Sequence, residues 1–289
     1  MKAIEAPPVR ADLASLLALA EETILPRQIS ERAKPLAPSP RFQLRVGVDL
    51  GTAYLVLVVV DETGCPVAGE WQFAEVVRDG LVVDFAGAAD LLRGMKGRLE
   101  RRLGRQLNSA SSAYPPGVPQ AEVRAVANVV EAAGMSCSGL VEEPTAANSV
   151  LQLQDGAIVD VGGGTTGIAI VRDGRVVFTA DEPTGGTHFS LVIAGSQNLS
   201  FEEAEALKIR PEEQARLFQS LRPVMEKVAN IILRHVEGRS VPSIVLVGGT
   251  SAFPNMAEVV EDYTHIPTWL PPNPLFVTPL GIAMHDKLQ

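Results

Sequence analysis

Two aspartates, each at the end of an apolar segment and each followed by a glycine turn, are the residues best suited to chemistry in this sequence. Asp49 precedes Leu50-Gly51-Thr52, and Asp160 precedes Val161-Gly162-Gly163-Gly164-Thr165. Glycine lets the backbone approach a phosphate because no side chain intervenes, and exposed amides and hydroxyls donate to oxyanions. A carboxylate at a strand end can hold a hydrated Mg²⁺ ion. The pattern therefore indicates a phosphate and magnesium site.

The two turns differ in strength as signals. Taken alone, an aspartate before a glycine turn, such as Asp49, is more often structural. Three consecutive glycines between apolar segments would weaken a sheet without a gain in packing, so a phosphate-binding turn explains Gly162–Gly164 better. Asp49 and Asp160 facing each other across a cleft would suit magnesium with a triphosphate.

Glu143 is a third candidate, at the start of Glu143-Pro144-Thr145-Ala146-Ala147. Pro144 fits the first turn of a helix. A plain interpretation makes Glu143 a first-turn residue that interacts with the helix dipole. The functional interpretation makes it the residue that orients an attacking water molecule.

Two further glycine pairs, Gly185-Gly186 and Gly248-Gly249, lie later in the chain. The second pair follows an apolar segment and precedes a helical one, an arrangement found at nucleotide sites and also in ordinary tight turns.

A capping box, Ser200 with Glu203, predicts a helix that carries Glu205 and Lys208 on one face. Those two residues are either a surface ion pair or part of a ribose and base pocket.

The elements that position these residues repeat along the chain. Segments 44–49 and 54–60 predict strands around the first turn, and 157–160 and 166–171 predict strands around the second. The alignment of VGVDLGTAYLVLVVVDETG with AIVDVGGGTTGIAIVRDG indicates an internal duplication. The other predicted elements are helices at 88–103, 119–133, 201–208, 212–237 and 255–263, and a strand at 243–247. Mixed sheets flanked by helices are the expected layers.

Composition limits the class of function. The 289 residues are 46% hydrophobic, enough for a sizeable core in one or two domains. A net charge of -9 argues against general nucleic-acid binding, which normally requires a basic surface. The two cysteines and four histidines lack metal-ligand spacing, so reduced thiols and no zinc site are expected. The longest apolar run, 55–60, is too short to cross a bilayer, and a secretion signal is not expected.

Residues 1–40 predict an N-terminal extension. Apolar positions after Asp12 have helical spacing, and the proline-rich stretch 35–40 cannot continue a helix. A loosely attached tail and a helix that docks a partner fit this pattern equally well.

Five motifs, in order, resemble the actin/Hsp70/sugar-kinase superfamily. They are phosphate 1 at 49–52, connect 1 at 143–147, phosphate 2 at 160–165, the adenosine motif at 247–250 and connect 2 at 278–283. Each motif is common alone, but five in register are hard to obtain by chance. The resemblance implies an α/β, actin-like ATPase fold with two duplicated ribonuclease-H-like lobes, whose mixed five-stranded sheets are flanked by helices. Hsp70 and bacterial actins insert a subdomain between the helices that correspond to 201–208 and 212–237. Only residues 209–211 lie there in this sequence, so the resemblance implies a reduced outer subdomain in the second lobe.

The implied domain organisation has four parts. They are the extension 1–40 (a short helix and a proline-rich linker), lobe I at 41–153 with phosphate 1 and connect 1, lobe II at 154–276 with phosphate 2 and the adenosine motif, and a connect 2 helix at 277–289 that returns to lobe I.

The resemblance also implies ATP or ADP with Mg²⁺ as ligands. Asp49 and Asp160 would organise magnesium through water, and Glu143 would position the hydrolytic water. The residues implied to contact the nucleotide are Gly51, Thr52, Gly162, Gly163, Gly164, Thr165, Gly185, Gly186, Glu205, Lys208, Gly248 and Gly249. The lysine that assists hydrolysis in Hsp70 has no matching motif, so at most slow ATP hydrolysis is expected.

A closer resemblance is to the EutJ family of ethanolamine-utilisation proteins, and it covers nearly everything after residue 41. It is carried by segments 76–80, 84–85, 114–117, 142–145, 160–171, 201–208 and 276–283. The resemblance implies a cytoplasmic, chaperone-like protein associated with bacterial microcompartments. Its client would be the ethanolamine ammonia-lyase or a shell or cargo protein, with no nucleic-acid or membrane partner, and the chain would be a monomer or small oligomer.

Three functions stay open at this point. The first is an ATP-switched chaperone or an assembly or reactivation factor, in which nucleotide changes the angle between the lobes. The second is a non-hydrolysing scaffold with a vestigial pocket. A small-molecule kinase is the least favoured, because the chain has little room for the elements that hold a phosphoacceptor.

Overall fold

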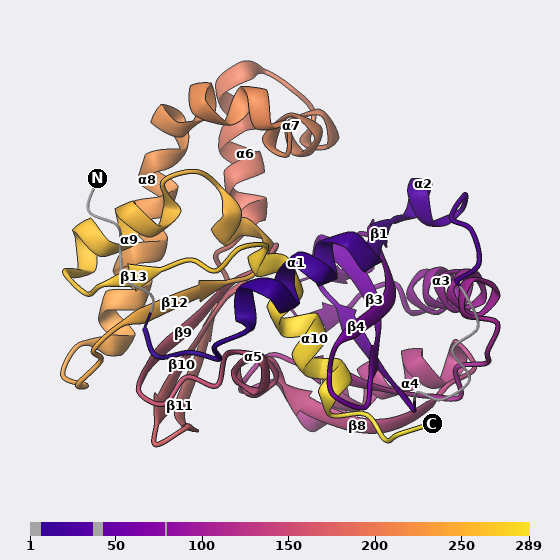
Figure 1. The fold of residues 1–289 in the computed structure, drawn as a ribbon. Coiled ribbons are helices and arrows are strands. Elements are labelled where there is room, and N and C mark those ends of the chain that lie inside the picture. The colour runs from indigo at the N-terminus through magenta and orange to yellow at the C-terminus, as the bar shows by residue number, and fades with distance from the viewer. Residues whose placement is uncertain (1–6, 37–42, 79) are drawn as a thin grey trace. The chain divides into compact units, whose positions relative to one another are not determined.

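A computed structural model describes residues 7–36, 43–78 and 80–289 (Figure 1). The chain forms two compact units. Lobe I contains residues 10–152 and 276–289, and lobe II contains residues 153–275 together with the described residues 7–9. Most of the proline-rich stretch predicted at 35–40 lies outside the described residues.

Lobe I contains a six-stranded mixed sheet of order β1-β4-β3-β2-β7-β8 and a separate β5-β6 hairpin. The strands are β1 (Ile24–Pro26), β2 (Leu44–Leu50), β3 (Tyr54–Asp61), β4 (Pro66–Phe73), β5 (Val77–Arg78), β6 (Leu81–Val82), β7 (Ser109–Tyr114) and β8 (Ser136–Glu142). The expectation of five strands is corrected here, because β1 from the N-terminal region pairs in parallel with the outer edge of β4.

Lobe II contains a five-stranded mixed sheet of order β11-β10-β9-β12-β13. The strands are β9 (Gly156–Val161), β10 (Thr166–Arg172), β11 (Arg175–Glu182), β12 (Ile244–Val247) and β13 (Thr268–Trp269). In both lobes an antiparallel meander of three strands is followed, on the side of its first strand, by two parallel strands. The shared order confirms the internal duplication.

Helices surround both sheets. In lobe I they are α1 (Leu13–Thr23), α2 (Arg27–Ser30), α3 (Phe85–Leu103), α4 (Gln120–Ala132), α5 (Glu143–Leu151) and α10 (Val277–Met284). In lobe II they are α6 (Gly186–Gln197), α7 (Phe201–Lys208), α8 (Pro211–Val236), α9 (Met256–Thr264) and the short 3₁₀ turns η1 (Gly249–Ala252) and η2 (Pro274–Phe276). The predicted helices are confirmed with small shifts at their ends, and α8 follows α7 after two residues, as a reduced outer subdomain requires.

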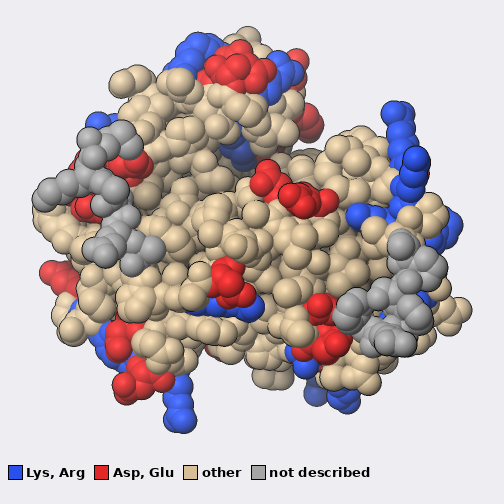
Figure 2. All heavy atoms as spheres, in the orientation of Figure 1, with Lys and Arg blue, Asp and Glu red and all other residues tan. Residues whose placement is uncertain are grey.

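The apolar run at 55–60 lies in the middle of the lobe I sheet, and all six residues are buried. Strands covered on both faces read as continuous apolar runs rather than alternating ones. Among the described residues, no helix has the length and apolar character needed to cross a membrane. On the face shown in Figure 2, basic and acidic side chains are interspersed over the surface.

The connect 2 helix α10 packs closely on lobe I. A Cβ atom at Gly47 on β2 would lie 2.5 Å from the Ala283 nitrogen, and a Cβ atom at Gly281 would lie 1.8 Å from the Ala146 carbonyl oxygen on α5. Side chains at either glycine would therefore hold the backbones apart. The connect 1 and connect 2 motifs thus meet in lobe I through glycine and alanine.

The described part of the N-terminal region, residues 10–36, is integrated into lobe I. We call it the N-terminal segment. Leu13, Leu16, Leu17 and Ala20 of α1 are buried, and α1 contacts β4. The sequence left a loose tail and a partner-docking helix open, whereas in the structure this helix buries its apolar face against its own lobe. The segment therefore differs from the separate extension that was expected.

Candidate functional site

The two predicted phosphate turns have the same backbone geometry. In lobe I the Gly51 amide donates to the Tyr54 carbonyl oxygen at 3.1 Å, and in lobe II the Gly162 amide donates to the Thr165 carbonyl oxygen at 3.0 Å. Asp49 and Asp160 occupy corresponding positions on β2 and β9, two residues before these glycines. Each lobe thus presents a half-buried aspartate next to a glycine turn.

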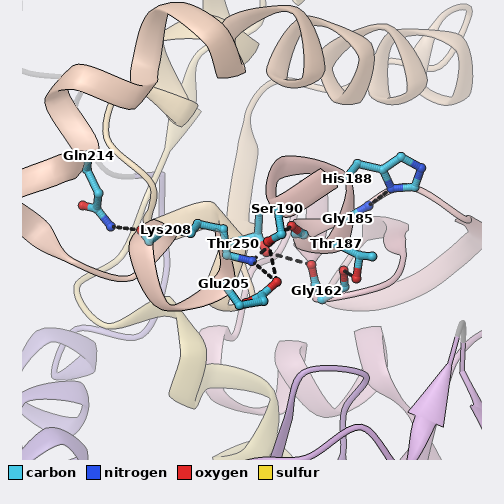
Figure 3. Close-up of polar contacts among 11 residues, drawn as sticks. Gly162, Gly185, Thr187, His188, Ser190, Glu205, Lys208, Gln214 and Thr250 are labelled. Carbon is cyan, nitrogen blue, oxygen red and sulfur yellow. Dashed lines mark hydrogen bonds and ion pairs between the residues drawn. The ribbon is translucent and has the colours of Figure 1, made fainter. Parts of the chain in front are cut away.

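In lobe II the carbonyl groups of the triple-glycine turn are held by α6 and the adenosine motif (Figure 3). The Gly162 oxygen accepts from the Gly186 amide at 2.9 Å and from the Thr250 hydroxyl at 2.8 Å. The Gly163 oxygen accepts from the Thr187 amide at 2.7 Å and from the Thr187 hydroxyl at 2.9 Å. The first amides of α6, which lack partners within the helix, are therefore satisfied by this turn.

Glycine is required where these loops meet. A Cβ atom at Gly185 would lie 2.7 Å from the Gly162 oxygen and 2.9 Å from the Gly163 oxygen. Gly248 has a φ of +86°, and its Cβ atom would lie 2.2 Å from an Asp160 carboxylate oxygen. The adenosine motif therefore packs against the aspartate of the phosphate turn, in a conformation and a space that favour glycine.

Glu205 and Lys208 form a largely buried ion pair at 2.7 Å rather than an exposed surface one. The predicted capping box is present, since the Ser200 hydroxyl accepts from the Glu203 amide and the Ser200 amide donates to the Glu203 carboxylate. Burial lowers the pKa of Lys208 below its ordinary value, and the neighbouring Glu205 carboxylate opposes that shift.

The ion pair is tied to the glycine loops. Lys208 donates to the Gly186 carbonyl oxygen at 3.1 Å, and the Ser190 hydroxyl lies within hydrogen-bond distance of both the Glu205 carboxylate and the Gly186 oxygen (Figure 3). The helix α7 is therefore connected to the start of α6, and through it to the triple-glycine turn.

The turn residues fit a phosphate. Within the described part of the chain, the Gly163 and Gly164 amides, which lie in the turn between β9 and β10, donate to no backbone carbonyl oxygen. Free amides on a glycine turn form an anion-binding concavity. The aspartate beside them is of the kind that holds a hydrated magnesium ion. Among the described residues, His, Cys, Asp and Glu form no cluster of three that could hold a metal directly.

The structure brings the lobe II candidates together. The turn 162–165, the pairs 185–186 and 248–249, and the Glu205–Lys208 pair are joined by the contacts above. The candidates Asp49, Gly51, Thr52 and Glu143 lie in lobe I, where Glu143 is the first residue of α5, as predicted.

The helix α6 and the hydrogen bonds of three hydroxyl groups in lobe II were not predicted from the sequence. These hydroxyls belong to Thr187, Ser190 and Thr250. The only available signal was the hydroxyl residue that directly follows each glycine pair, at Thr187 and Thr250.

Two lobes of the same strand order, each with an aspartate before a glycine turn, define a protein of the actin-like ATPase fold. A family model described as "Type IV pilus assembly protein PilM" matches residues 130–276. The crystal structure of MreB 5 of Spiroplasma citri bound to AMPPNP matches with a TM-score of 0.67 at 20% identity, covering 84% of this chain and 95% of that chain. At this identity, the similarity to MreB 5 shows a shared fold only.

Two further relatives are much more similar. Ethanolamine utilization protein EutJ of Escherichia coli is 44% identical over 245 residues, which cover 84% of this chain and 86% of that protein. The crystal structure of ethanolamine utilization protein EutJ from Carboxydothermus hydrogenoformans matches with a TM-score of 0.86 at 42% identity, covering 95% of this chain and 99% of that chain. The chain belongs to the EutJ family.

Proposed function

We propose that the protein binds ATP or ADP with Mg²⁺ and acts as a chaperone-like assembly or reactivation factor in ethanolamine utilisation. The observation that carries the nucleotide proposal is the duplicated turn, in which Asp49 and Asp160 precede glycines with matching hydrogen bonds. The names of the EutJ relatives support the link to ethanolamine, and the MreB 5 structure with AMPPNP supports the choice of ligand.

Each group has a chemical task in this proposal. The bound magnesium ion would neutralise phosphate charge. Asp49 and Asp160 would hold its water ligands, the two glycine turns would donate amide hydrogen bonds to the phosphates, and Glu143 would orient water. A ligand that engages the turns of both lobes would stabilise one lobe angle over others. The protein would work in the cytoplasm, on the ammonia-lyase or on a shell or cargo protein of a microcompartment.

Nucleotide binding is tested by thermal unfolding. Mg-ADP or Mg-ATP is expected to raise the Tm, because a ligand at a hundredfold excess over its Kd stabilises by about 2.7 kcal/mol. Asp160→Asn keeps the shape of the side chain but removes its charge, so this variant should lose most of the magnesium-dependent shift. The absence of any shift in the wild-type protein at millimolar nucleotide would instead favour a scaffold with a vestigial pocket.

Hydrolysis is tested separately with Glu143→Gln. Because Glu143 is assigned to water and not to the phosphates, the variant should bind ADP as the wild-type protein does. Its single-turnover ATP hydrolysis is expected to fall by about 10²-fold, the lower range for loss of a positioned proton acceptor. Equal hydrolysis rates at equal affinity would remove Glu143 from this role.

A further inference from the structure

The triple-glycine turn is held by more hydrogen bonds than its own hairpin requires. The Gly162 and Gly163 carbonyl oxygens each accept two hydrogen bonds, all from α6 and η1. A carbonyl oxygen has two lone pairs, so both acceptors are fully used. In each pair, one donor is a backbone amide and the other is the hydroxyl of Thr250 or Thr187.

Holding these carbonyls also fixes the orientation of two amides. The Gly162 carbonyl and the Gly163 amide belong to one peptide unit, and the Gly163 carbonyl and the Gly164 amide belong to the next. Peptide units are planar, and the described chain has no cis peptide bond, so in each unit the N–H points opposite to the C=O. With both carbonyls turned toward α6, both amides point away from it.

Glycine alone would not keep this orientation. Peptide units between glycines rotate easily because no Cβ restricts φ or ψ, and ordering them costs free energy that the ligand would otherwise have to supply. The hydrogen bonds donated by the α6 amides fix the position of the two carbonyl oxygens. The second hydrogen bond to each oxygen, donated by a threonine hydroxyl, resists rotation of the peptide plane. The space for this arrangement depends on Gly186, where a Cβ atom would lie 2.5 Å from the Thr250 hydroxyl oxygen.

We propose that Thr187 and Thr250 are positioning residues, whose hydroxyls preset the Gly163 and Gly164 amides to receive a phosphate of the nucleotide. The proposal rests on the proposed function for the identity of the ligand. Thr250 lies in the adenosine motif and Gly162 in the phosphate turn, so its bond also joins the two parts of the lobe II site. Neither hydroxyl acts on the reacting atoms.

The test compares Thr187→Val and Thr250→Val with Thr187→Ser and Thr250→Ser. Valine removes the hydroxyl and serine keeps it. Thr268→Val is the matched control, because the buried Thr268 hydroxyl also donates to a backbone carbonyl, that of Ile266 at 2.9 Å, but on strand β13. Each of the first two valine variants is expected to weaken Mg-ADP binding roughly tenfold, as for loss of one hydrogen bond. The serine variants and Thr268→Val should bind like the wild-type protein.

Hydrogen exchange of segment 160–166 separates positioning from general destabilisation. Without nucleotide, exchange in this segment should be faster in Thr187→Val and Thr250→Val than in Thr268→Val at equal Tm. At saturating Mg-ADP the protection of the segment should be smaller in the same two variants. Wild-type affinity together with wild-type exchange in both would overturn the proposal, as would serine variants that bind as weakly as valine variants. If the wild-type protein binds no nucleotide while the exchange difference persists, the proposed function is wrong, but Thr187 and Thr250 still position the turn.

Discussion

Replacing Gly281 with alanine is expected to unfold lobe I at a temperature several degrees below that of the wild-type protein. The added methyl group would lie 1.8 Å from the Ala146 carbonyl oxygen, so the backbones of α10 and α5 must move apart. Overpacking of a closely packed core costs about 1–3 kcal/mol, and here the obstacle is backbone rather than a side chain that can rotate. We therefore expect a loss of about 3 kcal/mol or more, which corresponds to roughly 6–12 °C in Tm.

Gly97→Ala is the matched control for this prediction. Gly97 also lies within a helix of lobe I, and a Cβ atom there would meet only the Arg101 guanidinium, at an ordinary 3.7 Å. Because alanine is a better helix former than glycine, this change should raise stability by about 0.5–1 kcal/mol. Two variants with equal Tm would show that α10 and α5 can separate at little cost.

Strands β7 and β8 of lobe I could not be predicted from the sequence, because their own residues do not favour strands. β7 reads SASSAY and β8 reads SCSGLVE, and small and polar residues have low preference for strands. β7 is nevertheless inserted between β2 and β8. The buried hydroxyl of Ser112 donates to the Val48 carbonyl oxygen at 2.6 Å. Tertiary packing therefore selects these strands, whereas the duplicated hairpins are selected by their own β-branched residues and turns.

The candidate site likewise combines features that follow from local sequence with contacts that only the folded chain creates. The glycine turns and the capping box are local patterns, and the structure has them at the predicted residues. The Thr250 hydroxyl and the Gly162 oxygen are 88 positions apart in the chain, and no periodicity connects them. The helix α6 was missed because its sequence, GTHFSLVIAGSQ, begins with glycine and carries no acidic residue in the first turn.

Replacing Glu70 with alanine is expected to cost as much as, or more than, the Gly281 change. The Glu70 side chain on β4 is fully buried. It accepts from Arg98 on α3 at 2.5 Å and from Ser30 of the N-terminal segment at 2.6 Å. Burial also lowers the pKa of Arg102, and the negative charge of Glu70 opposes that shift. Glu70 thus compensates two guanidinium groups beneath the N-terminal segment.

Loss of this carboxylate leaves positive charge buried without compensation. Breaking a buried ion pair by removing one partner typically costs about 3–5 kcal/mol, and we expect Glu70→Ala to lower the free energy of unfolding of lobe I in this range. Urea unfolding would measure the change. The control is Glu226→Ala, which breaks an exposed pair with Arg222 on α8, where a loss below about 1 kcal/mol is expected.

Hydrogen exchange would show where the effect of Glu70→Ala begins. β1 pairs in parallel with β4, where Leu25 lies opposite Glu70, and the Arg102 guanidinium donates to the Thr23 carbonyl oxygen. Amides of residues 24–30 are therefore expected to exchange faster in Glu70→Ala, before the rest of the lobe unfolds.

Replacing the pair together, by Glu70→Leu with Arg98→Met, should recover part of the stability, because apolar side chains of similar size avoid the desolvation of both charges. If Glu70→Ala is no less stable than Glu226→Ala, the buried Glu70 carboxylate does not stabilise lobe I, and the N-terminal segment is held by the apolar face of α1 and the pairing of β1 with β4.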